Sequence, residues 1–319
     1  MSQVAFPPVV ILGAGIIGVS FAAAFLDAGA AVTLVEPDQE RRNRVRAAIA
    51  EQQKAIETAG LKMGLEGRLE IDDGTSQSVP AANLVLECGP EDLEFKQRIF
   101  AELIGKTPEG TILATASSAI PMSRIVADRE QQARCLVAHP VNPPSVLRLV
   151  EIAPAPGTDP GNLKRASDLF TSLGFWPVTL AREIEGFILN RLQGAVLREA
   201  YRLVDDGVAG ANDIDKVMRL GLGPRWALSG PFETAELNTA GGIEAHVRRM
   251  GPAYRRMGEE RGETTDWRAE LVDMVVAERR QILALEDIPA RVEWRADAVA
   301  QLVAARDRIA SDGKNHRDD

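Results

Sequence analysis

The feature of this sequence that most constrains its fold is a glycine motif near the start of the chain. The apolar run Val9–Leu12 leads directly into Gly13-Ala14-Gly15-Ile16-Ile17-Gly18, and a helical pattern follows. In such a strand–turn–helix the first glycine permits a tight turn and the second lets the backbone approach a pyrophosphate, while the third lets the helix pack on the strand. The motif therefore predicts a βαβ unit of a dinucleotide-binding sheet.

The rest of the first half alternates short apolar runs with helical patterns. The apolar runs predict strands at Val9–Leu12, Ala31–Val35, Leu84–Glu87, Thr111–Ala114 and Arg134–Ala138. Helices are expected between them, at Ile16–Ala28, Gln39–Ala59, Leu93–Ile104 and Met122–Ala127. Two further strands are expected at Leu147–Ile152 and Trp176–Leu180, on either side of a helix at Gly161–Ser172. This alternation predicts a doubly wound parallel sheet of the Rossmann type, with helices on both faces.

The pattern changes after about Ala181. From Glu185 onward strand patterns are absent and helical patterns follow, at Phe187–Asp206, Asn212–Arg219, Gly241–Gly258, Asp266–Glu286 and Pro289–Ile309. A chain of 319 residues also exceeds the usual size of a single hydrophobic core. We therefore expect a Rossmann domain at residues 1–182 and an all-α domain at residues 183–319.

Charge and composition argue against several kinds of partner. The net charge is −9, whereas phosphate binding needs clustered positive charge, so we expect no nucleic-acid partner. No apolar run is long enough to cross a bilayer, and the start of the chain lacks the basic region of a signal peptide. Cys88 and Cys135 lie in apolar runs and suggest buried, reduced thiols, with no metal site nearby. We expect a cytoplasmic protein.

An acidic residue ends the second predicted strand. Glu36 follows Ala31–Val35 directly and can accept hydrogen bonds from both ribose hydroxyls of an adenosine. A carboxylate there would also repel a 2′-phosphate, which favours NAD over NADP as the cofactor, although Arg41 and Arg42 follow closely. The alternative is a glycine turn that binds no ligand.

The clearest candidate for proton transfer is His139. It ends an apolar strand and opens a proline-rich loop, and Glu151 follows within a second strand-like run that could lie alongside the first. A glutamate in an apolar strand is costly to bury unless it has a partner, and an imidazole N–H is a suitable one. Glu151 would then fix the tautomer of His139 and leave the other nitrogen free to move a proton. The alternative is an edge-strand glutamate that faces water.

Two other polar positions are candidates for binding a substrate oxygen. Ser117 and Ser118 follow a predicted strand, although such serines are often turn or cap residues. Asn190 lies at the start of the first long helix of the second half, where an amide on an apolar face needs a partner. The other two histidines, His246 in a basic helix and His316 in the tail, are expected to be solvated.

These residues together resemble the 3-hydroxyacyl-CoA dehydrogenase superfamily in order and spacing. The resemblance covers about Val9 to Glu233, and its motifs are Gly13–Gly18, Ala116-Ser117-Ser118, His139–Glu151 and Gly186–Arg191. It implies a general base at His139 oriented by Glu151, with Ser117 and Asn190 at the reacting oxygen. The residues that it implies at the cofactor are Gly13, Gly15, Ile16, Ile17, Gly18, Glu36, Glu91, Lys96, Ser117 and Asn142.

Within that superfamily the chain is similar to the branch of L-gulonate 3-dehydrogenase and lambda-crystallin. The similarity is carried by the segments Glu87–Lys96, Ala138–Pro144, Gly221–Arg225 and Arg291–Arg295. The chain differs from the branch at Ser118, where cysteine is more typical, and in having a shorter segment between Gly60 and Ala82. The branch implies NAD-dependent oxidation or reduction at C3 of a small hydroxy acid.

The sequence leaves several alternatives for the identity of the substrate. Arg225 is the candidate for a substrate carboxylate, because a guanidinium binds a carboxylate in a bidentate fork, but an interhelical ion pair is an equal alternative. A short-chain 3-hydroxyacyl-CoA ester would suit the basic helix that begins near Arg41, and carnitine would need aromatic residues such as Trp226. A non-catalytic crystallin-like or NAD-sensing protein is a further alternative. The resemblance also implies a homodimer.

Overall fold

The structure, a computed structural model, describes residues 8–74, 79–262 and 269–291, together with residues 294, 305 and 308. These residues fall into two compact units, one that extends to Leu197 and one that begins at Arg198. The first turns of helix α6 (Leu189–Asp205) therefore belong to the first unit. The domain limits expected from the sequence, 1–182 and 183–319, stay a prediction.

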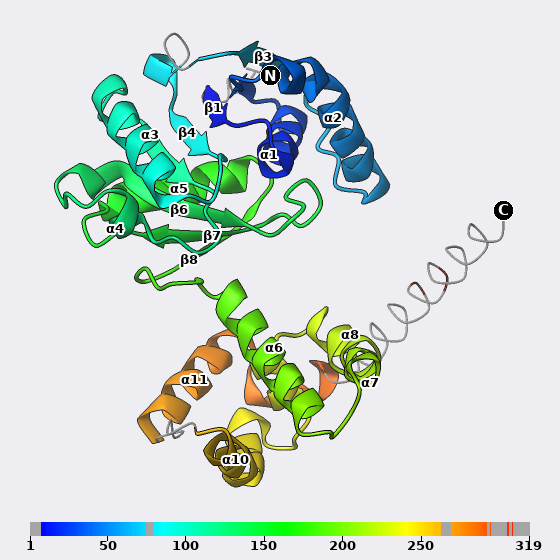
Figure 1. The fold of residues 1–319 in the computed structure, drawn as a ribbon. Helices are drawn as coiled ribbons and strands as arrows, with labels where there is room; N and C mark the ends of the chain where they lie inside the picture. The colour runs from blue at the N-terminus through cyan, green and yellow to red at the C-terminus, as the bar shows by residue number, and fades with distance from the viewer. Residues whose placement is uncertain are drawn as a thin grey trace. The chain divides into compact units, whose positions relative to one another are not determined.

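The first unit is built on one sheet in the order β3-β2-β1-β4-β5-β6-β7-β8 (Figure 1). Its strands are β1 (Val9–Leu12), β2 (Ala31–Val35), β3 (Arg68–Asp72), β4 (Leu84–Glu87), β5 (Ile112–Thr115), β6 (Cys135–Pro140), β7 (Leu149–Pro154) and β8 (Trp176–Thr179). The strands from β3 through β6 pair in parallel, which confirms the predicted doubly wound sheet. The chain order reverses between β1 and β4, and ligands of such sheets bind at that switch point.

Two features of the sheet differ from the sequence-based expectation. Strand β3 was not predicted, because Arg68, Glu70 and Asp72 alternate with apolar residues at an edge of the sheet and form no apolar run. Strand β7 runs antiparallel to β6, and β8 pairs in parallel with β7, so the sheet is not parallel throughout. The antiparallel pair places His139 directly opposite Glu151.

The helices of this unit are α1 (Ile16–Asp27), α2 (Gln39–Thr58), α3 (Leu93–Lys106), α4 (Met122–Ile125) and α5 (Pro160–Ser172), with 3₁₀ turns η1 (Val79–Ala81) and η2 (Gln131–Arg134). Aspartates cap three of them: the carboxylates of Asp38, Asp92 and Asp159 accept N–H groups in the first turns of α2, α3 and α5. Helix α1 differs, because Gly15, the residue before it, supplies no side-chain cap and its first turn has no acidic residue. Its N–H groups are therefore available to a ligand.

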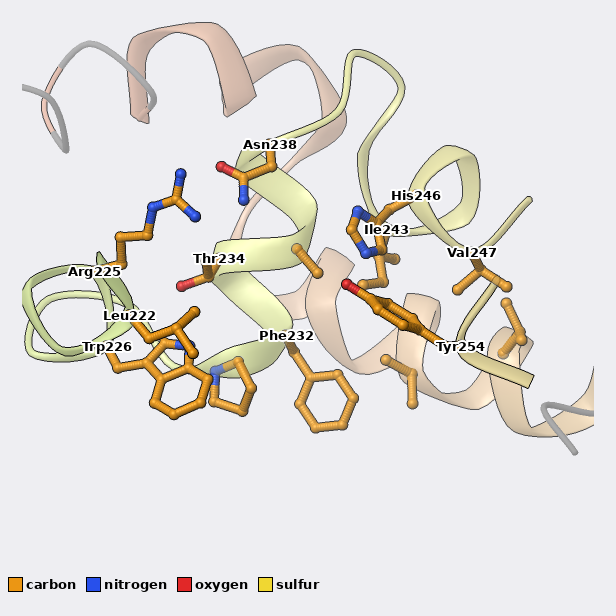
Figure 2. A pocket seen from close by; sticks show the side chains of 14 residues that line it. Leu222, Arg225, Trp226, Phe232, Thr234, Asn238, Ile243, His246, Val247 and Tyr254 are labelled. Carbon is orange, nitrogen blue, oxygen red and sulfur yellow. The ribbon is translucent and has the colours of Figure 1, made fainter. Parts of the chain in front are cut away.

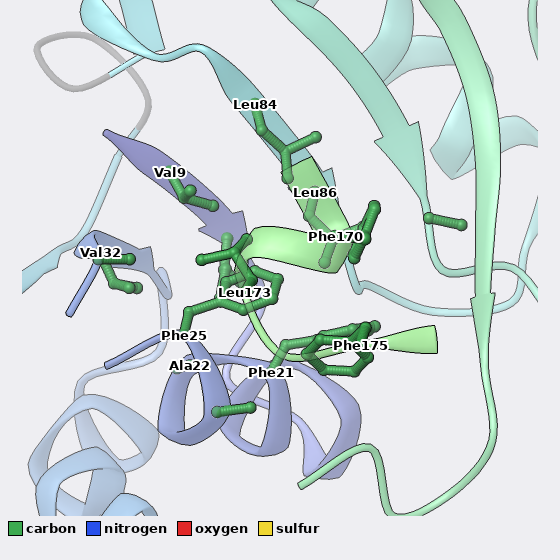
Figure 3. Packing of buried hydrophobic residues seen from close by; sticks show 14 of the residues in the cluster. Val9, Phe21, Ala22, Phe25, Val32, Leu84, Leu86, Phe170, Leu173 and Phe175 are labelled. Carbon is green, nitrogen blue, oxygen red and sulfur yellow. The ribbon is translucent and has the colours of Figure 1, made fainter. Parts of the chain in front are cut away.

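Apolar side chains bury both faces of the sheet. Along β1, Val9 and Ile11 join one core cluster, whereas Val10 and Leu12 join the other. Figure 3 shows the first cluster, where Phe21 and Phe25 of α1 pack against Phe170 and Phe175, and the Phe21 and Phe175 ring centroids are 5.3 Å apart. Replacing such a buried phenylalanine with alanine costs about 3–5 kcal/mol, so this cluster holds α1 firmly against the sheet.

The second unit is helical in the part that the structure describes. After α6 it contains α7 (Ala211–Val217), the π-helical turn η3 (Met218–Leu222), α8 (Gly223–Trp226), α9 (Pro231–Leu237), α10 (Gly242–Glu260), α11 (Ala269–Ile282) and the 3₁₀ turn η4 (Leu285–Asp287). This confirms the predicted helical second half, although α8 and α9 were not predicted. The helix expected at Pro289–Ile309, the tail and His316 lie largely or wholly outside the described residues. Among the described helices, none is long and apolar enough to span a membrane.

Candidate active site

The residues most suited to proton transfer are a buried pair at the carboxyl end of β6. His139 on β6 and Glu151 on β7 are register partners, so their side chains project from the same side of the sheet. The distance from Nδ1 of His139 to Oε2 of Glu151 is 2.8 Å. The two residues are 4% and 2% exposed, so water screens their interaction little. The sequence suggested this pairing, and the antiparallel register supplies its geometry.

The second carboxylate oxygen of Glu151 holds the start of α6. Oε1 accepts N–H groups from Ile188 at 2.8 Å and from Leu189 at 3.0 Å. Burial by itself would raise the pKa of Glu151, but the hydrogen bond from His139 and these two N–H groups lower the pKa below its ordinary value. Glu151 is therefore ionised at neutral pH, which assigns the Nδ1 proton to His139 as a donor.

A left-handed turn brings α6 to this carboxylate. Gly186 has φ +77° and Phe187 has φ +48°, and such a backbone conformation is unfavourable for phenylalanine. Phe187 is fully buried, and its ring centroid lies 5.4 Å from that of His139. Burial of this ring and the hydrogen bonds to Glu151 compensate for the strained turn. The same contacts restrict the His139 ring, whose Nε2 has no hydrogen-bond partner among the described residues.

Ser117 lies at the end of β5 and is almost fully buried. Its hydroxyl donates to Oε1 of Glu91 at 2.6 Å and accepts the N–H of Ile120 at 2.9 Å. Glu91 also accepts the N–H groups of Ser118 and Ala119, so it caps the whole turn. Burial would raise the pKa of Glu91, but the Ser117 hydroxyl, Lys96 and the backbone N–H groups lower it below its ordinary value. In this arrangement the single hydroxyl proton of Ser117 is engaged by Glu91.

Asn190 lies in the first turn of α6 and contacts the same turn. Its Nδ2 donates to the carbonyl oxygen of Ser118 at 2.7 Å, which leaves one amide N–H and the amide oxygen for other partners. Glu151 therefore connects two candidates, because its carboxylate binds His139 through one oxygen and the helix that carries Asn190 through the other. Tertiary structure thus links β5, β6, β7 and α6 around these side chains.

Beside the turn that Glu91 caps lies a buried ionic pair of Lys96 and Glu87, and Glu87 was not among the site residues expected from the sequence. Lys96 is 1% exposed, and its ammonium group donates to Oε2 of Glu87 at 2.8 Å and lies 3.5 Å from Glu91. Thr115 also donates to Oε2 of Glu87, at 2.6 Å. The available signal for Glu87 was an acidic residue at the end of the apolar run Leu84–Glu87, the same pattern that identified Glu36.

A cavity of about 490 Å³ lies at the switch point between β1 and β4, and its lining includes Gly13, Gly15, Glu36, Arg41, Glu87 and Cys88. A Cβ on Gly13 would lie 2.9 Å from the carbonyl oxygen of Cys88, and one on Gly18 would lie 2.0 Å from that of Gly13. Among the described residues, no heavy atom beyond the immediate chain neighbours lies within 4 Å of the Cβ position of Gly15. Gly15 therefore offers open backbone beside the uncapped start of α1, which fits a pyrophosphate.

Glu36 forms one wall of this cavity and is held by the backbone. Its carboxylate accepts the N–H of Ala14 at 3.0 Å and that of Asp38 at 3.0 Å, and each oxygen keeps a lone pair for a ribose hydroxyl. Arg42 donates to the carbonyl oxygens of Glu36 and Pro37, so its guanidinium already has backbone partners. Arg41 lines the cavity. This arrangement fits NAD.

The remaining predicted cofactor residues occupy different environments. Ile16 is 70% exposed at the start of α1, whereas Ile17 is partly buried against the core. Asn142 is exposed in the proline-rich loop, next to a cis peptide bond with Pro143. Their contact with a cofactor stays a prediction.

The second unit contains a separate cavity of about 530 Å³ that includes Arg225 (Figure 2). Apart from Arg225, the described residues that line it include no aspartate, glutamate, lysine or arginine, and they include the aromatic residues Trp226, Phe232 and Tyr254. The guanidinium of Arg225 forms no ion pair with another described residue, in contrast to the interhelical ion pair considered as the alternative. The cavity therefore combines one cation with aromatic walls.

His246 lines the same cavity, and the expectation that it is solvated was wrong. It is 8% exposed, and its Nδ1 lies 3.2 Å from the hydroxyl of Thr239. Burial and the positive charge of Arg249 lower the pKa of His246 below its ordinary value. The basic residues around it in the sequence suggested a solvated helix face, but His246 lies on the opposite, buried face of α10.

Sequence comparison connects these features to known proteins. The family model described as "3-hydroxyacyl-CoA dehydrogenase, NAD binding domain" matches residues 8–184, and that described as "3-hydroxyacyl-CoA dehydrogenase, C-terminal domain" matches residues 186–281. The chain belongs to the 3-hydroxyacyl-CoA dehydrogenase family. As a member of this family it is an NAD-dependent dehydrogenase, and the cavity at the switch point has the residues to hold NAD.

Individual relatives cover most of the chain. A lambda-crystallin homolog from Rattus norvegicus is 37% identical over 86% of this chain and 88% of its own length. An L-carnitine dehydrogenase from Streptomyces griseus is 36% identical over 74% of this chain and 71% of its own length. The fold is similar to that of a 3-hydroxyacyl-CoA dehydrogenase from Archaeoglobus fulgidus, with a TM-score of 0.71, 23% identity, and coverage of 93% of this chain and 98% of that one.

Proposed function

We propose that this 3-hydroxyacyl-CoA dehydrogenase family member oxidises the C3 hydroxyl of a free hydroxy acid, with His139 as the general base. The observation that carries the proposal is the buried contact of 2.8 Å between His139 and Glu151, which fixes the proton on Nδ1 and leaves Nε2 as the basic nitrogen. A positioned base of this kind typically contributes about 10²–10⁴-fold to a rate. Bound NAD supplies the hydride acceptor.

The chain's own residues divide the remaining work. Nε2 of His139 accepts the hydroxyl proton, and the ionised Glu151 stabilises the imidazolium that results. The free amide N–H of Asn190 donates to the reacting oxygen, where hydrogen bonds strengthen as charge develops. Ser117 donates to the same oxygen after its hydroxyl turns from Glu91. Reduction of a ketone follows the same steps in reverse.

Arg225 is the proposed ligand of the substrate carboxylate. Its guanidinium has no ion-pair partner among the described residues and lines a cavity, and a bidentate contact with a carboxylate would satisfy it. The segment from Gly221 to Arg225 also carries part of the resemblance to the L-gulonate 3-dehydrogenase branch, so L-gulonate is the first substrate candidate. The proposed class is a small 3-hydroxy acid with a free carboxylate.

A specific observation favours L-carnitine as a second candidate. Only Trp226 was expected to provide an aromatic surface, whereas the structure adds Phe232 and Tyr254 to the lining of the same cavity (Figure 2). Carnitine is a 3-hydroxy acid with a quaternary ammonium group, which aromatic faces attract, and its carboxylate would suit Arg225. A relative named L-carnitine dehydrogenase is 36% identical to this chain.

A CoA thioester is the main rival, since α2 carries Arg41, Arg44, Arg46 and Lys54 on exposed positions that suit phosphate groups. The test is NADH formation at 340 nm with NAD and, in parallel, L-gulonate, L-carnitine, L-3-hydroxybutyrate and 3-hydroxybutyryl-CoA. A free acid should have the highest kcat/KM. A higher kcat/KM for the thioester would contradict the free-acid proposal, and absence of turnover despite NAD binding would support a non-catalytic or NAD-sensing protein.

We also propose that the protein works as a cytoplasmic homodimer. Helix α6 has no buried residue, and Leu197, Tyr201 and Val204 expose apolar surface along it at helical spacing. Two-fold association would cover such a stripe, and closed two-fold dimers are the commonest oligomers. The free thiols of Cys88 and Cys135 suit a reducing compartment. Light scattering coupled to size-exclusion chromatography should give a dimer mass that falls to a monomer mass for Tyr201→Glu.

A further inference from the structure

The network of Glu87, Lys96 and Glu91 has a charge state that its contacts define. Glu87 accepts hydrogen bonds from the N–H of Gly89 at 2.7 Å, from Lys96 at 2.8 Å and from Thr115 at 2.6 Å. These three donors stabilise the carboxylate form of Glu87.

The carboxylate form of Glu91 is stabilised in the same way. It accepts from the Ser117 hydroxyl and from the N–H groups of Ser118 and Ala119, and its pKa is lowered. Two carboxylates therefore share the single ammonium group of Lys96, which lies 2.8 Å from Glu87 and 3.5 Å from Glu91. The network carries a net charge of one negative unit.

Part of this network is buried at the wall of the cofactor cavity. Glu87 is fully buried and lines the cavity, and Lys96 is 1% exposed, so solvent screens their charges weakly, whereas the Glu91 side chain is 42% exposed and is screened more. Cys88 in the same wall responds to this charge: burial raises the pKa of its thiol, Glu87 raises it further, and Lys96 opposes Glu87 with a smaller effect. The negative charge of Glu87 therefore outweighs the positive charge of Lys96 at this wall.

We propose that the Glu87–Lys96–Glu91 network makes the cavity favour the oxidised over the reduced nicotinamide dinucleotide, with Glu87 as the residue that sets this preference. The two forms differ by one positive charge on the nicotinamide ring, and a buried negative charge stabilises the more positive form. The proposal depends on the NAD cofactor and not on which hydroxy acid is the substrate. The proposal gives Glu87 a role in the relative affinity for the oxidised and the reduced cofactor.

The test varies the network charge and measures binding. Dissociation constants for NAD⁺ and for NADH are measured by calorimetry on the full-length protein without substrate. Glu87→Gln keeps the side-chain shape and makes the network neutral, and Lys96→Met gives it two negative charges. The double variant Glu87→Gln with Lys96→Met restores one negative charge without the ion pair.

The ratio of the NADH to the NAD⁺ dissociation constant should follow the charge of the network. It should fall about tenfold in Glu87→Gln, because this variant removes one weakly screened negative unit charge from the wall of the cavity. It should rise in Lys96→Met and return towards the wild-type ratio in the double variant. A purely structural role would weaken both ligands equally, and the double variant would bind worst.

Glu102→Gln is the matched control. Glu102 lies on the same helix, α3, in an exposed pair with Lys106, and its loss changes the protein charge by the same amount. This variant should keep the wild-type ratio. If Glu87→Gln leaves the ratio unchanged, or shifts it no more than Glu102→Gln does, the proposal is wrong. Should Glu87→Gln not fold, as judged by Tm, Glu91→Gln also removes one negative charge from the network and must lower the ratio, by a smaller factor because this side chain is 42% exposed.

Discussion

Nδ1 of His139 lies 2.8 Å from Oε2 of Glu151, and the two residues face each other across the antiparallel pair of β6 and β7. The other oxygen of Glu151 accepts the N–H groups of Ile188 and Leu189 at the start of α6. One buried carboxylate thus connects two strands and a helix. Its removal should affect both the orientation of the His139 ring and the position of Asn190.

The first prediction concerns this pair. Glu151→Gln should lower kcat by about 10²–10⁴-fold with little change in KM for NAD, because the amide cannot stabilise an imidazolium as a carboxylate does. His139→Asn should lower kcat at least as much. Steady-state kinetics with the best substrate of the panel check both variants.

Glu183→Gln serves as the control for this pair. The Glu183 carboxylate also accepts a backbone N–H, that of Ser123 at 3.1 Å, but it has no histidine partner among the described residues. Its kcat should stay within about twofold of wild type. A wild-type kcat in Glu151→Gln would refute the orienting role of Glu151.

The second prediction concerns stability in acid. The folded-state pKa of Glu151 is lowered, so its ionisation stabilises the fold above the unfolded-state pKa of about 4.3, and this contribution is lost as pH falls through the folded pKa. Glu151→Gln lacks it. Thermal unfolding followed by circular dichroism should show a lower Tm for the variant at pH 7 and a smaller difference near pH 3. A difference in Tm that stays constant over this range would argue against a lowered pKa.

The third prediction concerns cofactor choice at Glu36. Glu36→Ala should raise KM for NAD about tenfold or more, because the ribose hydroxyls lose their charged acceptor, and it should reduce the discrimination against NADP. Arg42 should provide little help to NADP, because it donates to the carbonyl oxygens of Glu36 and Pro37. The measurement is KM and kcat with NAD and with NADP for each variant. Glu40→Ala, at an exposed position of α2, is the control and should keep the wild-type values.

The fourth prediction concerns Arg225. Arg225→Met should raise KM for a free hydroxy acid about 10–100-fold, the loss expected for a hydrogen bond between charged groups, with a smaller change in kcat. Arg225→Lys should recover only part of the loss, because an ammonium group cannot form the bidentate contact. Arg219→Met, at an exposed arginine of η3, should leave KM unchanged. Wild-type KM values in all three variants would mean that Arg225 does not bind the carboxylate.

Local patterns in the sequence were sufficient for most of the sheet unit. Strands β1, β2 and β4 begin and end where their apolar runs predicted, because buried parallel strands are continuously apolar and turns delimit them. Strand β3 was not predicted because a strand at the edge of a sheet needs only one apolar face and therefore forms no continuous apolar run. The expectation that His246 is solvated failed for a related reason. The basic residues beside it in the sequence lie on the exposed face of α10, and only the packing of that helix shows that His246 is buried.

The sequence by itself determined the glycine turn, the glutamate that follows β2, the glutamate within β7 and the histidine near the end of β6, because each depends on neighbours along the chain. Only the tertiary structure decided how they combine. The antiparallel register places His139 opposite Glu151, and the left-handed turn at Phe187 brings α6 to that carboxylate. Packing brings Glu87 and Glu91 to the ammonium group of Lys96. These contacts join residues far apart in sequence, and their partners are set by how strands pair and helices pack.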